Sequence, residues 1–266
     1  MQPLIINAAD VSGLVGRLWW PSLRIGGFVL AAPIASEVAI PSRVKVVLTL
    51  ALAFVLAPLA PVPSALSIFS APGMLTAAQE LLIGVAIGMV MQLAFDGLTF
   101  AGQTISMSMG LGFATLIDPQ RGASVPVLGQ LVSIMGTLSY LAINGHLVLL
   151  GALANSFQTL PIGAANVDKD FLLAVATWGA RIFETGLLVA LPAMIALVIV
   201  NMALGVVARA APQLNLFGIG FTITLLCGFF VLMVGLDGIM VGISGVLEHA
   251  LRAVGDLTGA HLAGAP

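Results

Sequence analysis

Four long stretches of the chain carry no charged side chain. They run from residue 46 to 79, 122 to 167, 185 to 208 and 210 to 236. A helix that crosses a bilayer needs about 20 mostly apolar residues, so each stretch can hold at least one such helix. Charged residues make up only 8% of the chain, against roughly 25% in soluble domains. These features indicate an integral membrane protein.

The same composition argues against several classes of function. The net charge is −2 and the charged residues are scattered singly, so no basic surface is expected for nucleic acid. The single cysteine, Cys227, cannot form an internal disulfide, and His146, His249 and His261 do not have the spacing of metal ligands. Neither a Ser/His/Asp set nor a phosphate-binding loop is found. We therefore predict a protein that is not an enzyme and that uses no cofactor.

Proline and glycine residues divide the chain into six apolar segments. The segments cover residues 11–32, 44–59, 74–95, 127–150, 171–207 and 214–247. A helix rises 1.5 Å per residue and the hydrocarbon core is about 30 Å thick, so the last two segments are too long for one straight crossing. Pro192 is the predicted kink in the fifth segment. The sequence predicts an all-α membrane protein of about six bent helical segments arranged as helical hairpins.

Charged side chains inside these segments are costly in lipid and need partners. Six of them are expected to pair within the chain or between subunits: Arg17, Arg24, Glu80, Arg181, Glu184 and Asp237. Arg181 and Glu184 are spaced i, i+3 and can pair with each other. Arg24 has no acid within one helical turn, so its partner must come from elsewhere. Lone acids in membrane helices also suit proton or cation sites, which leaves a secondary transporter as an alternative.

Small residues form two further patterns. Gly84 and Gly88 make a GxxxG motif, which lets two helices approach closely. A second set of glycines falls on one face of the last segment: Gly228, Gly235, Gly238, Gly242 and Gly245. Both patterns predict helix-packing surfaces.

The stretch from residue 102 to 126 is apolar yet rich in glycine, proline, serine and threonine. We interpret it as a loop, because these residues disfavour a regular helix. Irregular backbone is tolerated at membrane depth only where it is buried in protein or lines a cavity. Methionine adapts its shape to irregular surroundings, so a glycine-hinged loop of this composition can serve as a deformable seal.

The sequence resembles the FliR/SctT family of type III secretion export-gate subunits. The resemblance rests on the order and spacing of several blocks: Glu80-x3-Gly84-x3-Gly88, Met109-Gly110-Leu111-Gly112-Phe113-Ala114, Asp118-Pro119, Asn144-Gly145-His146-Leu147, Ser156-Phe157 with Pro161, and Ala208-Arg209-Ala210-Ala211-Pro212-Gln213-Leu214-Asn215. It covers nearly the whole chain, and the Asn144 and Ala208 blocks are similar to flagellar members.

The resemblance implies a subunit that joins FliP and FliQ homologues in an export gate of the bacterial inner membrane, within the flagellar basal body. FlhA and FlhB homologues, unfolded flagellar export substrates and membrane lipid are the other implied partners. Residues 1–170 would form a FliP-like part and residues 171–266 a FliQ-like hairpin with a C-terminal tail. The family's pore plug maps to residues 107–119, with these contributing residues: Met107, Met109, Gly110, Leu111, Gly112, Phe113, Leu116, Ile117 and Pro119.

Three hypotheses follow. In the first, residues 107–119 close the gate and are pushed aside by an arriving substrate or partner, with glycines as hinges. In the second, the chain is a proton- or ion-coupled transporter of small molecules, although the two halves of the sequence show no convincing repeat. In the third, the chain is a passive scaffold subunit, which differs from the first only in whether the loop moves.

Overall fold

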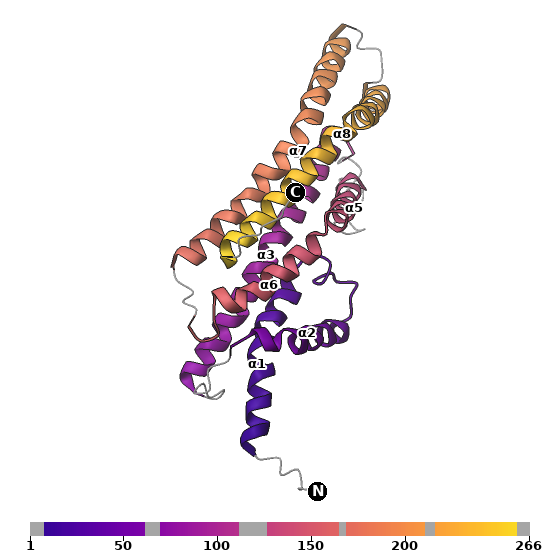
Figure 1. The fold of residues 1–266 in the computed structure, drawn as a ribbon. Helices are drawn as coiled ribbons and strands as arrows, with labels where there is room; N and C mark the ends of the chain where they lie inside the picture. The colour runs from indigo at the N-terminus through magenta and orange to yellow at the C-terminus, as the bar shows by residue number, and fades with distance from the viewer. Residues whose placement is uncertain (1–7, 62–69, 112–126, 165–168, 211–215, 260–266) are drawn as a thin grey trace. The chain divides into compact units, whose positions relative to one another are not determined.

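The computed structural model describes residues 8–61, 70–111, 127–164, 169–210 and 216–259, and the regular elements in these ranges are helices (Figure 1). In chain order they are α1 (Ala8–Ala31), α2 (Ser42–Leu56), the short 3-10 helix η1 (Ala57–Leu59), α3 (Ala71–Ser108), α5 (Val127–Ala142), α6 (Gly145–Thr159), α7 (Lys169–Ala210) and α8 (Leu216–Thr258). The predicted all-α fold is confirmed.

Several of these helices are long and apolar enough to cross a membrane. Among the described residues four candidates meet this test, at Ser42–Leu59, Ala71–Ser108, Phe171–Ala210 and Gly220–Thr258. The α5–α6 pair, which is interrupted by a short break, is a fifth candidate if it counts as one span. The structure thus agrees with a membrane protein of long apolar helices, although the predicted number of six segments is not reproduced.

The predicted segment 127–150 is divided into two helices. α5 ends at Ala142 and α6 begins at Gly145. Between them Asn144 has a φ of 55°, and the amides of Ile143 and Asn144 donate to the carbonyls of Ser139 and Leu141 at 3.0 and 3.1 Å. Asparagine tolerates this left-handed conformation better than most residues other than glycine. The Asn-Gly pair therefore ends one helix and begins the next.

The third helix is longer than predicted. The loop expected to begin at Gly102 is helical through Ser108, so that boundary was wrong. A Cβ atom on Gly102 would lie 2.5 Å from the carbonyl oxygen of Leu128 and 2.7 Å from Cα of Gly129. Glycine is needed here for close packing of α3 against α5, and its low helix propensity is overridden by that packing.

The chain divides into two compact units. The first comprises Met1–Gln92, Gly145–Gly179 and His249–Pro266, and the second comprises Leu93–Asn144 and Ala180–Glu248. Each of the long helices α3, α7 and α8 contributes residues to both units. These units cut across the chain order, whereas the predicted FliP-like and FliQ-like parts follow it, and that division of the sequence stays a prediction.

In the second unit α7 and α8 form an antiparallel hairpin. Val189 of α7 lies beside Gly242 of α8, and Asn201 of α7 lies beside Thr224 of α8. α7 continues through Pro192 as a single helix. The long hairpin predicted from the last two segments is present, with α8 extending to Thr258.

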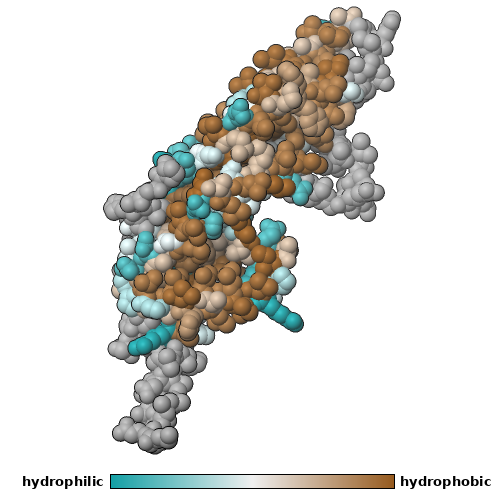
Figure 2. Space-filling view, turned by 45° about the vertical axis from the view of Figure 1, so that its right-hand side comes forward, coloured by the Kyte–Doolittle hydropathy of each residue, from teal (hydrophilic) through white to brown (hydrophobic). Residues whose placement is uncertain are grey.

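Apolar side chains dominate the face of the described residues that Figure 2 shows. On α7 and α8 large exposed examples are Phe183, Met202, Phe230, Met233 and Val241. A contiguous apolar surface of this kind marks contact with lipid or with partner helices.

Candidate functional site

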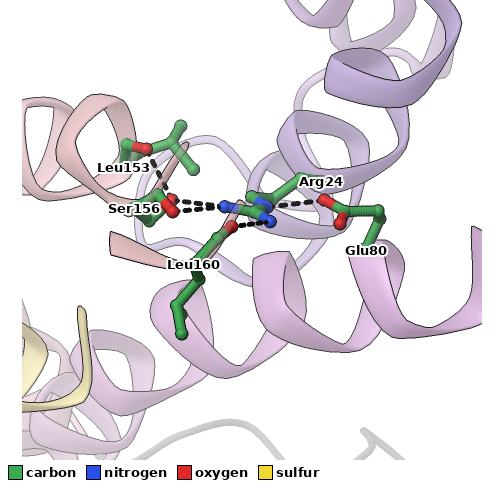
Figure 3. Close-up of polar contacts among 5 residues, drawn as sticks. All are labelled: Arg24, Glu80, Leu153, Ser156 and Leu160. Atoms are coloured by element: carbon green, nitrogen blue, oxygen red, sulfur yellow. Dashed lines mark hydrogen bonds and ion pairs between the residues drawn. The ribbon is translucent and has the colours of Figure 1, made fainter. Parts of the chain in front are cut away.

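The first compact unit holds a fully buried ion pair. Arg24 of α1 and Glu80 of α3 have side-chain exposures of 0% and 1%, and Arg24 Nε donates to Glu80 Oε2 at 2.7 Å. Figure 3 shows the guanidinium group between Glu80 on one side and Ser156 and Leu160 on the other. Arg24 and Glu80, both expected to pair within the chain or between subunits, are therefore partners of each other within the chain.

The other guanidinium nitrogens bind the C-terminal end of α6. Nη1 donates to the carbonyl oxygen of Ser156 at 2.7 Å and to its hydroxyl at 3.1 Å, while Nη2 donates to the carbonyl oxygen of Leu160 at 2.7 Å. The Ser156 hydroxyl in turn donates to the carbonyl of Leu153 at 2.7 Å. The Ser156 carbonyl also accepts from the amide of Leu160 at 2.9 Å. The C-terminal end of a helix carries partial negative charge, so a cation is favoured at this position.

An aromatic ring completes the surroundings of the cation. Arg24 Cζ lies 4.6 Å from the centre of the Phe157 ring, within the range of a cation–π interaction. Arginine stays charged when it is buried, so these contacts must replace the water that the guanidinium loses. Within the described residues, Glu80 Oε1 is buried and has no hydrogen-bond partner. Glu80 therefore relies on Arg24 as its hydrogen-bond donor, whereas Arg24 also has acceptors at the end of α6.

Glycines bring α1 and α3 together beside this ion pair. A Cβ atom on Gly84 would overlap the carbonyl oxygen of Arg24, and one on Gly27 would overlap that of Leu81. A Cβ atom on Gly88 would lie 2.7 Å from the amide nitrogen of Ala32. Backbones can approach this closely only without side chains at the crossing. Gly84 and Gly88 were predicted to pack against a helix, whereas Gly27 was missed.

The remaining charged candidates are exposed in the chain. Arg17, two helical turns before Arg24, is exposed, and Asp237 is exposed on α8. Arg181 Nη1 lies 3.3 Å from Glu184 Oε2, with both side chains just over half exposed. An exposed pair of this kind contributes about 0–1 kcal/mol to stability. These groups therefore do not share the site of Arg24.

The glycines on one face of α8 differ in whether another helix packs against them. A Cβ atom on Gly228 would lie 2.5 Å from Cε of Met109, and one on Gly242 would lie 3.2 Å from Cγ2 of Val189. Among the atoms that the structure describes, none outside α8 lies within 4 Å of a Cβ atom placed on Gly235 or Gly238, and Gly245 is half-buried. Met109 packs against Gly228 and Val189 of α7 packs against Gly242, both inside the second unit. The glycine face of α8 therefore does not pack against a single helix along its whole length.

The predicted plug begins at a capped helix end. The amide of Leu111 donates to the carbonyl of Ser106 at 3.1 Å, and that of Gly110 to the carbonyl of Met107 at 3.0 Å, with Gly110 at a φ of 82°. This bonding is the Schellman motif that ends many helices. Gly110 caps α3 in this structure, and the role of the glycines as hinges stays a prediction.

The side chains at this helix end differ sharply in exposure. Met109 is 0% exposed and Met107 is 69% exposed, while Leu111 is half-buried. The other predicted plug residues lie outside the described residues: Gly112, Phe113, Leu116, Ile117 and Pro119.

No group of three or more His, Cys, Asp or Glu side chains able to hold a metal ion is found in the part of the chain that the structure describes. The described polar site is instead a set of buried hydrogen bonds that joins α1, α3 and α6. Ser156, Phe157 and the carbonyl of Leu160 were not predicted as members. Ser156 and Phe157 belong to one of the blocks on which the family resemblance rests, but that block gave no indication that they bind Arg24.

Comparison with known proteins agrees with the resemblance noted from the motifs. Residues 15–250 match the family model described as bacterial export proteins, family 1. The chain is 40% identical over 229 residues to the flagellar biosynthetic protein FliR of Pectobacterium carotovorum subsp. carotovorum, covering 86% of this chain and 87% of the relative. It is 41% identical over 210 residues to FliR of Escherichia coli strain K12, covering 79% and 80%. Identity to FliR of Bacillus subtilis strain 168 is 29% over 238 residues, covering 88% and 92%.

Proposed function

Because the chain belongs to family 1 of the bacterial export proteins, we propose that it is a subunit of the flagellar type III protein export gate in the bacterial inner membrane. It assembles with FliP and FliQ homologues into the channel for unfolded flagellar subunits and works with FlhA and FlhB homologues. The observation that carries this proposal is the match over most of the chain to flagellar export proteins. The exposed apolar helices support it, because such surfaces need lipid or partner helices.

The division of labour within the chain is part of the proposal. Residues 1–170 act as the FliP-like part and residues 171–266 as the FliQ-like hairpin with its tail. The antiparallel pairing of α7 and α8 supports the second assignment. The transporter alternative loses one of its candidate acids, because Glu80 is paired with Arg24.

Residues 107–119 act as the plug of the closed gate. The segment starts at a capped helix end, where the Met109 side chain is buried and the Met107 side chain is exposed on the surface of the chain. The apolar side chains that follow occlude the channel by excluding water. An export substrate or a partner then displaces the part of the segment that lies beyond the cap.

Assembly tests the membership of the gate. The chain, tagged and co-expressed with the FliP- and FliQ-like proteins of its source genome, is expected to purify in detergent as one defined complex that contains all three. Native mass spectrometry measures the composition. A monomer or homodimer that ignores these partners would contradict the proposed function and would revive the transporter alternative.

Ion leak tests the plug. Changing Met107, Met109 and Phe113 together to glycine removes apolar bulk from the segment, so the closed gate is expected to conduct ions at least several-fold more than the parent complex. Single-channel recording in planar bilayers measures the conductance. A matched variant with Met202, an exposed methionine of α7, changed to glycine should leave it unaltered. Equal conductance of the triple variant and the parent would show that this segment does not close the gate.

A further inference from the structure

Asn201 is the one amide side chain in the uncharged stretch 185–208, and it joins three helices of the second compact unit. Its Nδ2 donates to the carbonyl oxygen of Ser108, the last residue of α3, at 3.3 Å. The hydroxyl of Thr224 on α8 lies 3.2 Å from Asn201 Oδ1 and 3.0 Å from the carbonyl of Gly220. A hydroxyl has one hydrogen, so Thr224 donates to one of these acceptors at a time.

The Ser108 carbonyl needs this partner for a specific reason. In the cap that ends α3, the carbonyls of Ile105, Ser106 and Met107 accept from the amides of Met109, Leu111 and Gly110. None of these three amides donates to the carbonyl of Ser108, which among the described residues accepts from Asn201. In the isolated chain Ser108 is half-buried and Asn201 is exposed. Both belong to helices long and apolar enough to cross a membrane, where a polar group without a hydrogen bond is costly because no water replaces the partner. The Asn201 amide supplies the bond from a neighbouring helix, as asparagine does in membrane bundles.

A second contact holds the adjoining residue. Met109 is 0% exposed, and its side chain packs on the bare backbone of Gly228 in α8, where a Cβ atom would lie 2.5 to 2.9 Å from Met109 Cε, Cγ and Sδ. Two consecutive residues at the end of α3 are therefore held by α7 and α8, one through its carbonyl and one through its side chain.

We propose that Asn201 is a positioning residue of the gate, because it fastens the start of the plug segment to the α7–α8 hairpin. Asn201, Thr224 and Gly228 together with Ser108 and Met109 form what we call the latch. While the latch is closed, Ser108 and Met109 stay fixed against α7 and α8. The gating consequence rests on the proposed function, whereas the latch itself rests only on the contacts described above.

Thiol accessibility at the end of α3 tests the latch directly. Ser106 is 0% exposed and its hydroxyl is without a hydrogen-bond partner among the described residues, so Ser106→Cys in a Cys227→Ser background is a conservative reporter. In the detergent-purified complex the reporter should react slowly with a maleimide. Adding Asn201→Leu, which keeps the side-chain size and removes the amide, is expected to raise the labelling rate roughly five- to tenfold, the population ratio that one hydrogen bond sustains.

Matched variants separate the latch from general damage. Asn201→Gln keeps the amide and should label within about twofold of the parent reporter. Thr224→Val leaves the bond from Asn201 to Ser108 in place and should give a smaller rise than Asn201→Leu. Thr137→Val on α5 removes a hydroxyl that donates to Ser133, and Asn155→Leu removes an exposed amide on α6, so both should leave the rate unchanged.

Each outcome decides the latch separately from the plug. If Asn201→Leu labels no faster than the controls, the latch is wrong even where the plug variant leaks. If Asn201→Leu labels faster without increased ion leak, the latch is supported and its gating consequence is contradicted, while the plug is still decided by its own variant. If Asn201→Leu does not assemble, Gly228→Ala in the same reporter tests the second contact, since its methyl group displaces Met109. Slow labelling of Gly228→Ala would likewise overturn the latch.

Discussion

Replacing Arg24 with methionine is expected to destabilise the first compact unit by about 3–5 kcal/mol, the cost of breaking a buried ion pair from one side. All four hydrogen bonds of the guanidinium are lost at once, and Glu80 is left in an apolar interior without a partner for either oxygen. The carbonyl of Leu160 also loses its donor. We expect the melting temperature of the detergent-solubilised complex to fall by roughly 10 °C, or the complex not to form.

Two further variants make this result interpretable. Arg17→Met removes the same charge from the same helix, but from an exposed position, and should change the melting temperature little. Glu80→Gln keeps the shape and an oxygen that can accept from Arg24 Nε, so its effect should be clearly smaller than that of Arg24→Met. Melting is followed by the amount of complex that survives heating and elutes intact.

The comparison of melting temperatures between the Arg24→Met and Arg17→Met variants decides whether the buried network stabilises the protein. If Arg24→Met and Arg17→Met melt at the same temperature, the buried network does not stabilise the assembled protein. A double variant, Arg24→Met with Glu80→Leu, removes the stranded carboxylate and should recover part of the loss. Recovery should stay incomplete, because the C-terminal end of α6 still lacks the cation that caps it.

Gly84→Ala is expected to have an effect of similar size at the neighbouring helix crossing. The added methyl group would overlap the carbonyl oxygen of Arg24 and come within 2.8 Å of its carbonyl carbon and 2.9 Å of the amide nitrogen of Phe28. These are backbone atoms, so no side chain can rotate to relieve the clash, and α1 must move away from α3. We expect a loss of at least about 3 kcal/mol, since overpacking that displaces backbone lies at the upper end of its usual range.

Displacement of α1 also stretches the ion pair, since Arg24 belongs to the clashing helix turn. Gly84→Ala should therefore lower the yield of intact complex about as strongly as Arg24→Met. Gly151→Ala is the control, because Gly151 is exposed on α6 and no described atom outside its helix lies within 4 Å of the new methyl group. Alanine favours the helix over glycine, so this control should lose nothing. Equal yields of the two alanine variants would show that the α1–α3 crossing tolerates a side chain.

Much of the fold could be predicted from the sequence, because a membrane helix is recognised by the summed hydrophobicity of its residues. The absence of charge over long stretches indicated membrane helices, and the lengths of the last two segments indicated the α7–α8 hairpin. Helix ends were predicted less well. The loop expected from Gly102 is helical to Ser108, because α5 packs against a glycine whose intrinsic preference is against a helix. The segment 127–150 breaks at Asn144, where a left-handed residue interrupts an apolar run.

The candidate site was predicted only in part. Arg24 and Glu80 were recognised as costly charges, since burying either one in an apolar segment demands a partner whatever the fold. Their pairing, and the capping of α6 by Arg24, join residues 56 and 132 positions apart in the chain. Asn201 was overlooked because an amide carries no charge and its partner is a backbone carbonyl, which leaves no trace in the pattern of side chains.

The sequence by itself determined that this chain is a bundle of apolar helices, that Arg24 and Glu80 need partners, and that the chain resembles the export-gate family. These conclusions follow from hydrophobicity, charge and motif order, which are properties of the residues themselves. Only the tertiary structure decided which groups meet: Arg24 with Glu80 and α6, and Asn201 with the end of α3. Such contacts depend on how closely backbones approach at Gly27, Gly84 and Gly228, and that distance is set by the packing of whole helices.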